Sequence, residues 1–164
     1  MSFLVQRFES HNIELAQQAL DRIEDCANKA LEWFEALSQE SKSELGRLEA
    51  ELKEIKKKVN QWRGILNDVW GNKGKLEQVI KELDEESASI SEFLRNIEDL
   101  MNRISAKVQE SQKTNQEKWE NLVKEQNKLH NLKKKVNELQ TFLGSARIWF
   151  GKIKWEVRAK KKRR

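Results

Sequence analysis

Apolar residues recur in this chain at alternating steps of three and four, and this heptad pattern constrains the fold more than any other feature. Such spacing places a narrow apolar stripe along one side of a helix, which is typical of coiled-coil and helical-bundle contacts. The 164 residues include no proline, which favours long uninterrupted helices. We therefore predict an all-α protein. The residues assigned to the helix-pairing seam are Leu45, Leu48, Leu52, Ile55, Val59, Trp62, Leu66, Val69, Ile80, Leu83, Ile90, Leu94, Ile97, Met101, Ile104, Val108, Leu129, Leu132, Val136 and Leu139.

Three short stretches without the apolar pattern divide the chain. The stretches 38–44 and 111–118 each contain a capping box, which begins at Ser41 in the first and at Thr114 in the second. Between them, the sequence Gly-Asn-Lys-Gly at 71–74 has the composition of a turn between helices. We expect helices at about 10–39, 42–70, 75–110 and 115–142.

Two elongated architectures fit these breaks. In the first, four helices fold up and down into an antiparallel bundle about 45 Å long, at ~1.5 Å per residue. In the second, only the glycine turn reverses the chain, which gives a hairpin of two helices of about 100 Å each. The sequence thus predicts an elongated antiparallel helical bundle or a long coiled-coil hairpin. Because the core of such a fold is thin, we expect self-association or a helical protein partner.

Positive charge is concentrated at the C-terminal end. The net charge is +5, but residues 1–143 carry −3, and residues 144–164 carry nine basic side chains and one acidic. This asymmetry is typical of a near-neutral body with a basic tail. We therefore divide the chain into a helical body at 1–143 and a basic aromatic segment at 144–164. The heptad phase runs on through this segment, so one interpretation is that it continues the last helix.

On a helix, this C-terminal segment is amphipathic, because Trp149, Phe150 and Ile153 share one face and cations cover much of the rest. Aromatic rings beside cations suit the interface of an anionic membrane. They also suit nucleic acid, although the lack of basic patches elsewhere in the chain disfavours that partner. The predicted site for an anionic surface or partner comprises Arg147, Trp149, Phe150, Lys152, Ile153, Lys154, Trp155, Arg158, Lys160, Lys161, Lys162, Arg163 and Arg164.

The residue types that carry catalysis or bind metals do not form recognisable motifs. His11 and His130 lie far apart, and neither has the spacing that places two metal ligands on one helix face. Cys26, the single cysteine, forms neither an internal disulfide nor a thiolate metal site by itself. We therefore expect no catalytic residues, no metal and no cofactor.

Our leading hypothesis is a non-enzymatic coiled-coil scaffold or adaptor that mediates protein–protein association. Its basic aromatic C-terminal segment would bind an anionic surface or partner. Two alternatives stay open: a membrane-active helical bundle that remodels or perforates bilayers, and a nucleic-acid-binding accessory protein. No apolar run approaches the roughly 18 residues of a membrane span. We accordingly expect a cytoplasmic protein that is peripheral at a membrane if the C-terminal segment binds lipid.

Overall fold

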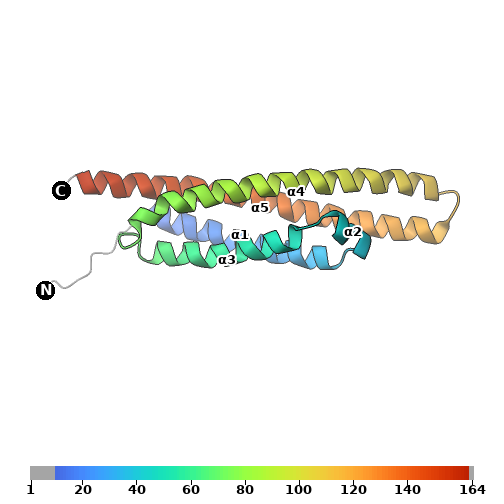
Figure 1. Ribbon diagram of the computed structural model, residues 1–164, viewed down its shortest axis with the longest axis horizontal. Helices are drawn as coiled ribbons and strands as arrows, with labels where there is room; N and C mark the ends of the chain where they lie inside the picture. The colour runs from blue at the N-terminus through green and yellow to red at the C-terminus, as the bar shows by residue number, and fades with distance from the viewer. Residues whose placement is uncertain (1–9, 163–164) are drawn as a thin grey trace.

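The structure, a computed structural model, describes residues 10–162, and this part of the chain is all-helical, as predicted (Figure 1). No strand occurs within the described range. The elements in order are α1 (His11–Glu35), α2 (Gln39–Glu44), α3 (Leu48–Asn67), the short 3₁₀ helix η1 (Lys73–Lys75), α4 (Leu76–Ser111) and α5 (Gln116–Lys162).

The long helices α1, α3, α4 and α5 lie along one axis, and each runs opposite to the next in the chain (Figure 1). α5 packs closely along both α1 and α4, and α1 also packs against α3. The contact between α3 and α4 is looser. The longest helix, α5, is therefore the element that joins the first half of the chain to α4.

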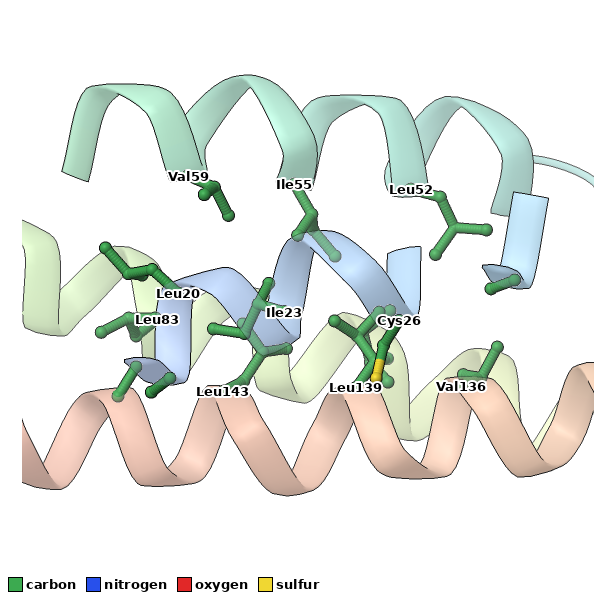
Figure 2. Close-up of a cluster of buried hydrophobic side chains, with 14 of the residues drawn as sticks. Leu20, Ile23, Cys26, Leu52, Ile55, Val59, Leu83, Val136, Leu139 and Leu143 are labelled. Carbon is green, nitrogen blue, oxygen red and sulfur yellow. The ribbon is translucent and has the colours of Figure 1, made fainter. Parts of the chain in front are cut away.

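The core is a continuous file of apolar side chains between these helices. Figure 2 shows Leu20 from α1, Ile55 and Val59 from α3, and Leu139 and Leu143 from α5 in one such cluster. Each fully buried side chain of this size contributes about 1.5–3 kcal/mol relative to exposure. All the residues assigned to the seam are buried except Leu94, Met101 and Val108 of α4, which are half-buried.

The stretch 38–44, which we predicted to be a break, is mostly helical, because α2 covers Gln39–Glu44; the residue that caps α2 is Ser38 rather than Ser41. The Ser38 Oγ accepts a hydrogen bond from the Ser41 backbone N–H at 3.3 Å. α2 ends after six residues, and Gly46 follows with a φ of 56°, the left-handed conformation that ends many helices. The predicted helix 42–70 is therefore two helices, α2 and α3.

The other two breaks also differ in detail from the prediction. At the glycine turn, the Asp68 Oδ1 accepts a hydrogen bond from the Gly71 backbone N–H at 3.0 Å. A Cβ at Gly71 would displace this carboxylate, so glycine lets Asp68 approach the backbone of the turn closely. Before α5, the Asn115 Oδ1 accepts from the Lys118 backbone N–H at 3.1 Å, so Asn115 rather than Thr114 is the capping residue.

The last helix is longer than the predicted range 115–142. α5 continues without a break to Lys162, so residues 144–162 extend the same helix. Ser10 at the start of α1 donates a hydrogen bond to Glu156 of α5 at 2.8 Å. This contact places the start of α1 and the C-terminal end of α5 at the same end of the molecule, beside the turn between α3 and α4 (Figure 1).

Candidate functional site

The predicted C-terminal site divides into an inner and an outer side of α5. Phe150 and Ile153 have no exposed surface, and they pack in the core. The prediction that these two side chains contact an external surface is therefore wrong for the folded chain. The heptad pattern continues through both residues. The apolar face of α5 that could have contacted a membrane therefore packs against the other helices.

The remaining members of the predicted site lie toward solvent to different degrees. Trp149 and Lys154 are half-buried. The exposed members are Arg147, Lys152, Trp155, Arg158 and Lys160. Lys161 and Lys162 belong to α5, but their side chains lie outside the described residues, as do Arg163 and Arg164.

Two large apolar side chains are exposed within residues 10–162, and both belong to this part of α5. Ile148 is 53% exposed and Trp155 is 71% exposed. They are seven positions apart, about two helical turns, and therefore share one face. Gly151 lies between them, and the Arg147 guanidinium lies beside it, 3.6 Å from the place of an added Cβ. Ile148 was missed by the sequence analysis, although its spacing from Trp155 was visible.

We define the outer stripe of α5 as Ile148, Gly151, Lys152, Trp155 and Arg158. At 100° per residue, Ile148 and Trp155 lie on the side of α5 opposite the buried residues of the same segment. Gly151 and Lys152 flank them, and Arg158 lies at the edge of the stripe toward α4. The Lys152 Nζ lies 4.8 Å from the centroid of the Trp149 ring, a cation–π distance. The stripe therefore combines exposed apolar surface with cations on one side of the molecule.

Ion pairs between α4 and α5 hold this part of α5 in register. The Arg147 Nε contacts the Asp84 Oδ1 at 3.2 Å, and the Lys154 Nζ forms an ion pair with Glu77. The hydrogen bond and positive charge of Lys154 lower the pKa of the Glu77 carboxyl. Since Asp84 and Glu77 are seven residues apart on α4 and their partners are seven apart on α5, the two pairs report one antiparallel register.

The structure also brings cations of the turn between α3 and α4 to the same end. Lys73 of η1 lies beside Trp70, with its Nζ 5.7 Å from the ring centroid. Lys73 lines a shared cavity with Lys154 and Arg158. Neither Lys73 nor Trp70 belonged to the predicted site, because only the fold places residues 70–75 beside the end of α5.

A second group of polar contacts joins the break between α1 and α2 to α5. The Glu125 carboxylate of α5 accepts hydrogen bonds from the Ser38 backbone N–H and from the Ser41 hydroxyl, both at 2.8 Å. Burial raises the pKa of Glu125, but these hydrogen bonds outweigh it, so the net shift is downward. Glu125 therefore anchors α2 on α5.

A pair of carboxyl groups occupies the loose contact between α3 and α4. Glu86 lies beside the seam of α4, in a row with Val79 and Phe93 at steps of seven residues. It is 5% exposed, and its Oε1 accepts from the Lys58 Nζ at 2.6 Å. Its Oε2 has no donor among the described residues. A hydrogen bond to Glu86, burial and the negative charge of Glu86 raise the pKa of Glu51 to about 7. A proton on Glu51 would thus supply the donor that Glu86 lacks.

Metal-binding side chains do not gather into a group of three or more within residues 10–162. In the same range, no helix combines the length and the apolar character needed to cross a membrane. The chain matches no model of a known protein family, no curated protein and no solved structure.

Proposed function

We propose that this protein is a non-enzymatic scaffold or adaptor, an elongated antiparallel helical bundle with heptad seams that attaches to an anionic membrane surface by the C-terminal end of α5. The observation that carries this proposal is the exposure of Ile148 and Trp155 among cations on the outer stripe. Contiguous exposed apolar surface that is rimmed by polar residues marks sites of contact with proteins or membranes.

The chemistry of the stripe favours a lipid surface over a purely apolar partner. The Trp155 ring suits the headgroup level of a bilayer, where an apolar ring and a polar N–H are both accommodated. Each Lys or Arg near an anionic leaflet contributes about 1 kcal/mol to attachment. Lys152 and Arg158 are exposed on the same side as Trp155, so they approach the surface together with the ring.

Attachment by this stripe leaves the bundle folded. A membrane-active mechanism would need the inner face of α5 to enter the bilayer, and that face includes the fully buried Phe150 and Ile153. Withdrawing each of them from the core costs about 1.5–3 kcal/mol. Peripheral attachment needs no such step, which supports an adaptor over a pore-forming or remodelling protein.

The proposed contact with another protein involves the C-terminal half of α4. Leu94, Met101 and Val108 belong to the heptad seam but stay half-buried in the single chain. A second copy or a helical partner would cover them, and we propose self-association or a helical partner at this place. In the cell, this describes a cytoplasmic protein that is peripheral at a membrane.

Co-sedimentation with liposomes tests the attachment. The full chain should sediment with vesicles that contain anionic lipid and not with neutral vesicles. Lys152→Gln should weaken binding about fivefold, the effect of one cation near the surface. Trp155→Ser should weaken binding without unfolding the chain, because this side chain is 71% exposed.

The matched control is Lys134→Gln, which removes the same charge from an exposed position on the body of α5 and should leave vesicle binding unchanged. Equal binding by wild type and Trp155→Ser would contradict the proposal. Displacement of the chain from anionic vesicles by duplex DNA at low salt, with steep loss of DNA binding as salt rises, would favour the nucleic-acid alternative instead.

A further inference from the structure

A cavity of about 380 Å³ lies between the turn that precedes α4 and the C-terminal part of α5. Three cations line it: Lys73 of η1, and Lys154 and Arg158 of α5. Glu77 of α4 also lines it and pairs with Lys154. The charged lining therefore has a net charge of +2, contributed by two segments that are about 80 residues apart in the chain.

The start of α4 adds a further positive contribution. Leu76, the first residue of α4, lines the cavity; η1 leads directly into α4, and no side chain caps the start of either helix. The backbone N–H groups and the dipole of a helix favour an anion at its N-terminus. Gly74, another lining residue, has no side chain, and an added Cβ there would meet no atom within 4 Å. The cavity is thus open beside the helix terminus.

The cavity adjoins the outer stripe of α5. Arg158 lines the cavity and lies one helical turn from Trp155. When the Trp155 ring lies at the headgroup level of a bilayer, Arg158 holds the edge of the cavity within about one helical turn of the same layer. The ligand best placed to reach it is a lipid headgroup.

We propose that this cavity binds the phosphomonoester group of a membrane lipid. A phosphomonoester carries about −1.5 to −2 charges at neutral pH, which matches the net charge of the lining, whereas a phosphodiester headgroup carries one negative charge at its phosphate. The Arg158 guanidinium offers two parallel N–H donors to phosphate oxygens, and Lys73 offers a point charge from the opposite wall. This inference rests on the proposed attachment of α5 to an anionic surface and adds the group that is recognised.

The test compares vesicles of matched surface charge, one set with phosphatidic acid and one with phosphatidylserine. The full chain should bind the phosphatidic acid vesicles about fivefold more tightly. Lys73→Gln should remove this preference while keeping the binding to phosphatidylserine. Lys75→Gln is the matched control. Lys75 carries the same charge and lies two residues from Lys73, but it does not line the cavity.

Soluble glycerol 3-phosphate tests whether the cavity binds a phosphomonoester on a lipid or on a soluble molecule. An excess should abolish the preference for phosphatidic acid and leave the binding to phosphatidylserine vesicles intact. If the chain binds glycerol 3-phosphate as tightly as it binds the lipid, the ligand is a soluble phosphate ester and the lipid assignment is overturned.

Failure of the cavity and failure of the attachment give different results. Equal affinity for the two vesicle types at matched charge overturns the phosphomonoester site while the attachment by the outer stripe stands. The absence of binding to every anionic vesicle overturns the attachment and, with it, this inference. Loss of the preference in Lys75→Gln as well as in Lys73→Gln would assign the effect to diffuse charge and overturn the cavity as the site.

Discussion

The half-buried carboxyl group of Glu51, which lies beside the buried Glu86, makes the stability of this bundle depend on pH. The pKa of Glu51 is raised from 4.5 to about 7 by its hydrogen bond with Glu86, by burial and by the negative charge of Glu86. A raised pKa in the folded state means that the contribution of protonated Glu51 is complete below pH 4.5 and is lost as the pH rises through about 7. Of the other charged groups here, Lys58 of α3 opposes the upward shift of the Glu51 pKa and Glu54 of α3 adds to it. Glu82 of α4 raises the pKa of Lys58.

We expect the melting temperature of the wild type to fall between pH 5 and pH 8. Glu51→Gln should flatten this fall, because glutamine retains a donor for Glu86 and does not ionise. At pH 8 the variant should melt roughly 2–4 °C above the wild type, a modest shift because solvent still screens the Glu51 carboxyl. Thermal melts followed by circular dichroism at several pH values measure this difference.

Glu85→Gln is the control for this prediction, since Glu85 is next to Glu86 in sequence but is exposed. It should keep the pH dependence of the wild type. If Glu51→Gln and the wild type show parallel melting curves from pH 5 to pH 8, the pair does not share a proton in the folded chain.

At the scale of the elements, the heptad pattern predicted most of the buried side chains, but it did not predict how each helix is used or that Leu94, Met101 and Val108 are only half-buried. The pattern continues through Phe150 and Ile153, and sequence alone allowed that face either to contact a membrane or to extend the core. The loose fit of α3 to α4 depends on the whole bundle, so no local pattern marked Glu86 as a buried partner of Lys58. Lys73 joined the candidate site for the same reason, since its neighbours on α5 are distant in sequence.

Two glycines in one stretch of the chain should respond in opposite directions to alanine. Gly46 has a φ of 56°, which L side chains adopt at a cost, so Gly46→Ala should destabilise the fold by about 1 kcal/mol. Gly64 lies within α3, and an added Cβ would meet no atom within 4 Å. Gly64→Ala should therefore stabilise the fold by about 0.5–1 kcal/mol.

Chemical unfolding of both variants beside the wild type tests this pair, because each serves as the control for the other. The opposite sign excludes a general effect of replacing glycine. A stable Gly46→Ala variant would mean that α2 and α3 can merge into one continuous helix, as the sequence pattern alone suggested.

At the scale of the whole molecule, the C-terminal part of α5 makes different contacts on its two sides. Its outer stripe is the proposed contact with an anionic surface, and its inner side supplies Phe150, Ile153 and Val157 to the core. A chain truncated after residue 143 would lose the stripe and these core residues together. Each of the three buried side chains is worth about 1.5–3 kcal/mol, so this truncation should lower the free energy of unfolding by several times that of a surface substitution.

Loss of vesicle binding by the truncated chain would therefore confound attachment with folding, whereas Trp155→Ser separates them. We expect the truncated chain to melt well below the wild type, whereas Trp155→Ser should melt at the temperature of the wild type. Both variants should bind anionic vesicles poorly. Calorimetry and co-sedimentation on the same samples measure the two effects. A truncated chain with an unchanged melting temperature would show that the bundle is complete without residues 144–164, and α5 would then end functionally near Leu143.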